Sequence, residues 1–99
     1  MLNHIALLNF RDELGESDKR IAAVKLKSGL EDLADKIEGL IDIRVETLLL
    51  DCSSADILLL CKLQDREALE RLKTSPLLFN IKPIIDENLD RVHTADYIS

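Results

Sequence analysis

The chain has 99 residues, with 19 acidic and 13 basic side chains and a formal net charge of −6. This size predicts one compact domain over residues 1–99, and the negative charge opposes a nucleic-acid partner. Apolar residues make up 46% of the chain, including 20 Leu and 10 Ile but only three aromatic residues. A real core is therefore available, while no apolar run approaches the roughly 20 residues of a membrane helix.

The N-terminus and the cysteines indicate a compartment. Residues 1–4 carry neither a basic segment nor a small-residue cleavage site, so no secretory signal is expected. Cys52 and Cys61 form neither a metal-binding spacing nor a dense disulfide framework. We expect a cytoplasmic protein with reduced thiols.

The first half of the chain predicts a strand, a helix and a second strand. Residues 2–10 are short and apolar, and four consecutive apolar residues, 5–8, indicate a strand buried on both faces. Ser17 is the expected N-cap of the helix that follows, and Gly39 is expected to close it. Residues 41–49 alternate between apolar and charged side chains, which predicts a strand with one face in water. The apolar stripe of the helix comprises Ala23, Leu26, Leu30, Leu33 and Ile37.

The second half predicts an inner strand, further helix and a closing strand. Residues 57–61 are a continuous apolar run, as expected of a strand in the middle of a sheet. Asp65 is the expected N-cap of the next helix, and Ser75 followed by Pro76 restarts it. Pro83 is expected to end or bend that segment. Residues 89–98 are the expected last strand.

The element order β-α-β-β-α-β is that of the α+β ferredoxin-like fold, a four-stranded antiparallel sheet with helices on one face. In that topology the first and third strands lie in the middle, and these are the two segments with continuous apolar runs. The chain has no segment left to cover the second face of the sheet. We therefore expect a homodimer in which the open sheet faces of two copies pack together.

Five parts of the chain together match the pattern of a known family: residues 2–10, residues 63–69, Pro76, residues 81–86 and residues 95–97. They resemble the stress-responsive A/B barrel (Dabb) family of the dimeric alpha-beta barrel superfamily. The resemblance covers nearly the whole chain and implies a homodimer whose two sheets close into a barrel. It does not imply one particular reaction, although a plant branch of the family cyclises polyketides.

The cyclase chemistry does not transfer to this chain residue by residue. The general-base histidine of that branch falls at Leu78, and the histidine of the preceding His-Pro pair falls at Ser75. A leucine cannot move a proton. A tyrosine expected on the second helix is also missing, and Leu72 and Lys73 stand nearby. These departures favour a non-catalytic protein.

His4 matches the N-terminal histidine of the family and is the main candidate site residue. It shares a face of its strand with Ala6, and antiparallel pairing with the last strand brings Asp96 and Tyr97 close to it. Two interpretations of His4 stay open: a ligand-pocket residue oriented by Asp96 or Tyr97, and a hydrogen-bonded structural residue at a sheet end. A register slip of one residue would exchange the two faces, and the sequence does not determine the register.

No other motif predicts chemistry. His93 is expected at a surface or interface, Cys61 as a buried apolar side chain, and Cys52 as an exposed thiol. Asp51 and Asp56 flank a turn but lack further oxygen ligands at cation-binding spacing, so neither a metal nor a cofactor is predicted.

Two functional hypotheses follow. The first is a homodimeric barrel of unassigned activity that binds a small hydrophobic ligand or serves in a stress response. The alternative is a small cyclase- or lyase-like enzyme that acts on a hydrophobic carbonyl or aromatic compound with His4 as acid and base.

Overall fold

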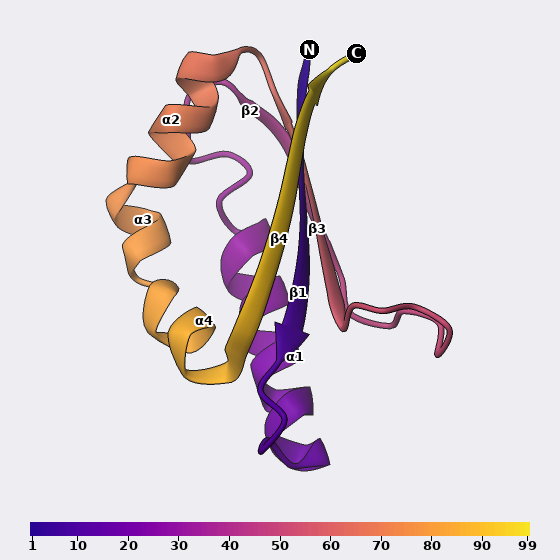
Figure 1. Ribbon diagram of the computed structural model, residues 1–99. Helices are drawn as coiled ribbons and strands as arrows, with labels where there is room; N and C mark the ends of the chain where they lie inside the picture. The colour runs from indigo at the N-terminus through magenta and orange to yellow at the C-terminus, as the bar shows by residue number, and fades with distance from the viewer.

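The computed structural model describes residues 1–99 and confirms the ferredoxin-like order of elements. The sheet is antiparallel with strand order β2-β3-β1-β4, so β1 and β3 lie in the middle as expected. The helices lie on one side of this sheet (Figure 1). The elements are β1 (Leu2–Phe10), α1 (Glu16–Glu31), β2 (Leu40–Glu46), β3 (Ile57–Leu63), α2 (Arg66–Thr74), α3 (Pro76–Phe79), α4 (Lys82–Asn88) and β4 (Leu89–Ile98).

The register of β1 determines the two faces of the sheet. Every second side chain of β1 is buried beneath the helices, from Leu2 through His4 and Ala6 to Phe10. The intervening residues of β1 point to the opposite side, which we call the open face. Following the pairing across the sheet, the open face carries Asn3, Ile5, Leu7, Asn9, Asp42, Arg44, Glu46, Leu58, Leu60, Lys62, Arg91, His93, Ala95 and Tyr97.

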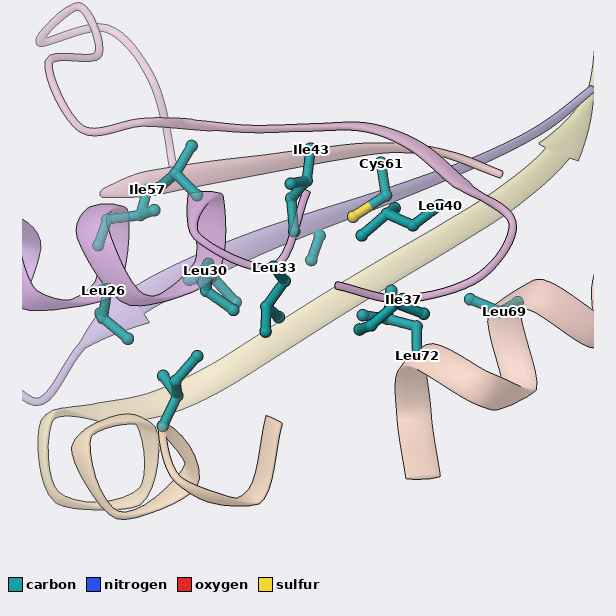
Figure 2. Packing of buried hydrophobic residues seen from close by; sticks show 14 of the residues in the cluster. Leu26, Leu30, Leu33, Ile37, Leu40, Ile43, Ile57, Cys61, Leu69 and Leu72 are labelled. Carbon is teal, nitrogen blue, oxygen red and sulfur yellow. The ribbon is translucent and has the colours of Figure 1, made fainter. Parts of the chain in front are cut away.

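The first helix differs from its prediction at both ends. Its N-cap is Gly15, which makes no side-chain cap, so the assignment of Ser17 as N-cap is wrong. The helix ends at Glu31, and tighter turns follow, in which the amides of Leu33, Ala34 and Lys36 each bond the carbonyl three residues earlier. Leu33 and Ile37 nevertheless remain in the core (Figure 2). The apolar stripe therefore predicted the burial of Leu26, Leu30, Leu33 and Ile37 correctly. It placed Ala23 in the core where Ala22 is the buried residue, and it overestimated the length of the helix.

Gly39 adopts the left-handed conformation, with φ of 87°, but it leads into β2 rather than closing a helix. A Cβ at this position would lie 2.6 Å from the Cβ of Ala68 on α2. Both the backbone conformation and the close approach of α2 therefore require glycine here.

The segment between β2 and β3 differs from the prediction that residues 41–49 form one strand. β2 ends at Glu46, and residues 47–56, which we call the arm, form a turn-containing extension beyond the sheet (Figure 1). Leu48 and Leu50 on the arm are 96% and 74% exposed. Sequence periodicity alone did not reveal that these leucines lack a neighbour to pack against.

The predicted caps of the second half of the chain are confirmed, but the role of Pro83 is not. Asp65 accepts a hydrogen bond from the Ala68 amide at 2.9 Å, and Ser75 caps the helix that Pro76 begins. Pro83 lies in the first turn of α4 instead of ending a helix. Proline is tolerated there because its missing N–H has no helical partner in a first turn.

The core lies between the sheet and the helices and consists of one cluster of 20 buried residues (Figure 2). It joins α1 and α2 to the inner sides of β1, β2 and β3, and β4 contributes only Leu89. No helix of the protein has both the length and the apolar character needed to cross a membrane.

Candidate functional site

His4 and Asp96 form a direct side-chain pair. The antiparallel register sets His4 opposite Asp96, and both side chains lie on the helix-covered face. The Nδ1 atom of His4 lies 2.5 Å from Oδ1 of Asp96. His4 is only 9% exposed and is the one buried polar residue of the chain. A short hydrogen bond to a carboxylate meets the requirement that a buried polar group have a partner.

The register also places Tyr97. Tyr97 is opposite Asn3 and belongs to the open face. Of the two partners that the sequence suggested for His4, Asp96 therefore bonds it and Tyr97 does not. Tyr97 is half exposed and borders hollows on both sides of the sheet edge.

A groove of about 400 Å³ lies between α2 and the C-terminal half of β4. It exists because no helix covers β4, whose residues are exposed from Asp90 to Ile98. Asp96 lines the groove, while His4 does not. His4 therefore bonds the carboxylate of Asp96 from the buried side, away from the groove. The lining residues are Leu2, Arg66, Leu69, Glu70, Lys73, Asp96, Tyr97 and Ile98.

The groove combines an apolar wall with one oriented carboxylate. Oδ1 of Asp96 is engaged by His4, and Oδ2 accepts no hydrogen bond from the protein. Arg66 and Lys73, which project from α2 at the rim, form no ion pair with any carboxylate. A ligand in this groove would meet an acceptor at Asp96, cations at the rim and an apolar surface between them.

Sequence reasoning missed the contribution of α2 to the groove. Arg66, Leu69 and Lys73 are spaced by three and four residues, which places them along one side of a helix. This spacing could be recognised in the sequence. The sequence did not show that β4 lacks a covering helix, which is why this side of α2 becomes a wall of the groove. Leu78, at the position of the cyclase base, packs against the core.

The remaining candidate residues have structural surroundings. Burial, with the nearby carboxylates of Asp42 and Asp96, raises the pKa of the Cys61 thiol to about 12, so this buried thiol is unreactive. Cys52 is exposed on the arm. Asp56 accepts a hydrogen bond from the Phe10 amide at 2.9 Å. His, Cys, Asp and Glu side chains nowhere gather in a group of three that could hold a metal ion.

The fold and groove define a ferredoxin-like α+β protein with one uncovered sheet face and a lateral groove. A family model described as the stress responsive A/B barrel domain matches residues 2–99. The chain therefore belongs to the stress-responsive A/B barrel (Dabb) family, as its sequence motifs implied. A comparison with curated proteins finds no match.

Solved structures share the fold at low sequence identity. A Bacteroides fragilis protein described as dimeric, ferredoxin-like and of unknown function superposes with a TM-score of 0.93 at 21% identity, covering 99% of this chain and 95% of that chain. A Dabb family protein of Mesorhizobium loti gives a TM-score of 0.73 at 11% identity, covering 99% and 95%. A protein described as an antibiotic biosynthesis monooxygenase gives 0.77 at 12% identity, covering 100% and 98%.

Proposed function

We propose that this protein is a homodimer that binds a small hydrophobic ligand in the groove between α2 and β4. The observation that carries the proposal is the carboxylate of Asp96, which lines an uncovered groove and is held at 2.5 Å by the buried His4. An isolated carboxylate on a surface strand would be free to rotate. A carboxylate oriented by a buried imidazole is a fixed acceptor, as small-molecule sites require.

The open face supports the dimer. Its centre is apolar, while charged residues follow its β2 side, an arrangement common at protein interfaces. The similar Bacteroides fragilis protein is described as dimeric. The apolar side chains of the open face are Ile5, Leu7, Leu58, Leu60, Ala95 and Tyr97.

The lining of the groove suggests the class of ligand. Leu2, Leu69 and Ile98 favour an apolar body. The free Oδ2 of Asp96 favours a group that donates a hydrogen bond, such as a phenol or an alcohol. We therefore propose an aromatic or aliphatic alcohol rather than a pure hydrocarbon.

Binding of 1-naphthol and naphthalene, measured by fluorescence titration, tests this site. The two probes share an apolar body, and only 1-naphthol donates a hydrogen bond. A hydrogen bond to a charged acceptor contributes about 1.5–3 kcal/mol, so we expect 1-naphthol to bind at least about tenfold more tightly. Asp96→Ala should remove this preference and leave naphthalene binding nearly unchanged.

Thr94→Ala is the matched control, because Thr94 lies on the same side of β4 two residues from Asp96 and does not line the groove. It should keep the preference for 1-naphthol. Equal binding of both probes to the wild-type protein, or a preference that survives Asp96→Ala, would contradict the proposed site.

The alternative is a small enzyme with His4 as acid and base. The His4–Asp96 pair favours it, since a carboxylate orients the imidazole of many catalytic histidines. A fold neighbour is described as an antibiotic biosynthesis monooxygenase, which also supports this alternative. Because the groove reaches Asp96 and not His4, we rank binding first. Product formation from a bound carbonyl compound, abolished by His4→Gln while binding persists, would reverse that order.

The proposal also covers the domain organisation, the location and the biological role of the protein. We propose a single domain over residues 1–99 and a cytoplasmic location, where the free thiols Cys52 and Cys61 would stay reduced. A role in stress response is proposed from the family alone.

A further inference from the structure

The arm between β2 and β3 leaves the sheet on the side of the open face (Figure 1). We propose that residues 47–56 clasp the partner subunit, with Leu48 and Leu50 buried against it. This inference rests on the proposed homodimer and adds to it the segment that extends the interface beyond the open face of the sheet.

The direction of the arm supports this role. Figures 1 and 2 both show it leaving the sheet on the side opposite to α2, α3 and α4, which is the side of the open face. Its direction is maintained by hydrogen bonds to the end of β1. Leu8 accepts from the Asp56 amide, and the Asn9 side chain donates to the Ser54 carbonyl, each at 2.9 Å. The arm is thus pre-organised for a partner.

The leucines of the arm have no cover within their own chain. Leu48 is 96% exposed and Leu50 is 74% exposed. Both leucines line a hollow of about 520 Å³ between the arm and the N-terminal half of α1, so they do not pack tightly against that helix. Large apolar side chains exposed on a projecting segment are typical of an interaction site.

The arm would also bring the open face to the size of a standard interface. It presents 14 side chains, whereas a standard stable interface uses roughly 20–30 residues from each partner. The arm adds ten residues, 47–56, which brings the surface into that range. In a two-fold symmetric dimer each arm contacts the other copy, so the interface contains two arm contacts.

The dimer dissociation constant, measured by analytical ultracentrifugation, tests the proposal. The double variant Leu48→Ser/Leu50→Ser should raise this constant at least about a hundredfold, because four leucine side chains would leave the interface of the dimer. Both residues are exposed in one copy, so circular dichroism should show an unchanged fold. The matched control is Ile21→Ser/Phe79→Ser, which alters two exposed apolar residues of α1 and α3 and should change the constant less than about threefold.

A variant of the open face separates this inference from the proposed dimer. Leu7→Asp places a charge in the middle of that face and should weaken the dimer strongly. If Leu7→Asp weakens the dimer and the arm variant does not, the clasp is wrong and the homodimer stands. If the wild-type protein is a monomer at micromolar concentration, the homodimer fails and the clasp fails with it.

Discussion

β2 and β4 are the two edge strands of the sheet, and their surroundings differ along their whole length. β2 lies beneath α1, and its inner residues Leu40, Ile43 and Val45 are buried. The free backbone groups of Val45 are also occupied, since its amide donates to Glu31 at 3.0 Å and its carbonyl accepts from Lys27 at 2.7 Å. Two side chains of α1 thus close this edge against further strand pairing.

β4 has no comparable cover. Leu89 is buried, but the nine residues that follow it are exposed. The one strong tether of its helix-facing side is the bond between Asp96 and His4. β4 is held mainly by its backbone hydrogen bonds with β1. The side of α2 that faces β4 is therefore uncovered and forms one wall of the groove.

The difference separates a strongly stabilised edge from an uncovered edge within one small sheet. Burial and side-chain hydrogen bonds concentrate at β2, where the apolar area removed from water is greatest. The uncovered edge at β4 forgoes that stabilisation, and in the proposed function its surface takes the ligand. We therefore expect substitutions near β2 to affect folding most, and substitutions in β4 to affect binding more than folding.

Gly39→Ala should produce the largest loss of stability, because it alters the entry to the closed edge. Alanine would adopt a strained left-handed conformation at φ of 87° and press its Cβ against Ala68 at 2.6 Å. Strain and overpacking together should lower the free energy of unfolding by about 3 kcal/mol or more. Urea denaturation followed by circular dichroism measures this loss.

Gly15→Ala is the matched control for this substitution. Gly15 has a negative φ and no heavy atom within 4 Å of the added Cβ, so the change should stay below about 1 kcal/mol. Similar losses for the two alanines would show that the contact between α2 and the start of β2 is loose, and the contrast between the edges would fail.

Asp96→Ala should cause an intermediate loss, because it removes the main tether of the open edge. His4 is 9% exposed, and its Nδ1 atom would lose its partner. An unpaired buried polar group costs about 1–3 kcal/mol, and water entering from the groove should hold the loss near the lower end of that range. Urea denaturation at pH 7 measures it.

Thr94→Ala should change the free energy of unfolding by less than about 0.5 kcal/mol, because Thr94 is exposed and its side chain makes no hydrogen bond. If Asp96→Ala is as mild as Thr94→Ala, the His4–Asp96 bond contributes nothing to the open edge. A loss as large as that of Gly39→Ala would instead show that the β4 edge contributes as much to the stability of the fold as the β2 edge does.

The sequence predicted the strand order because two strands carry unbroken apolar runs, and only central strands are buried on both faces. It predicted the caps at Asp65 and Ser75 because a capping side chain acts on amides two or three residues away. It did not predict the end of α1 at Glu31. The apolar stripe continues through Leu33 and Ile37, and periodicity reports burial whether or not the backbone stays helical.

The candidate site shows the same limit. His4, Asp96 and Tyr97 were selected from the sequence, but the choice of Asp96 as partner depends on the register between β1 and β4, which alternation alone does not determine. The share of α2 in the groove depends on how far the helices extend across the sheet. These features depend on tertiary packing, which local sequence patterns do not determine.

Glu31→Gln should produce the smallest of the three losses, and this loss should depend on pH. The hydrogen bond from the Val45 amide, helped by Lys27, lowers the pKa of Glu31 below its ordinary value of 4.5. A carboxyl whose pKa is lower in the folded state stabilises the fold above the unfolded-state pKa, and that contribution is lost as pH falls through the folded-state pKa.

At pH 7 the substitution should cost about 0.5–1 kcal/mol, since the Glu31 side chain is 35% exposed and solvent screens its charge. Urea denaturation at pH 7, 5 and 3 should show the difference from wild type shrinking below about pH 4.5. Asp32→Asn is the control, because Asp32 pairs with Lys36 in the same spacing but is 68% exposed and makes no hydrogen bond to β2. A constant difference at all three pH values, or one equal to that of Asp32→Asn, would show that the charge of Glu31 does not close the β2 edge.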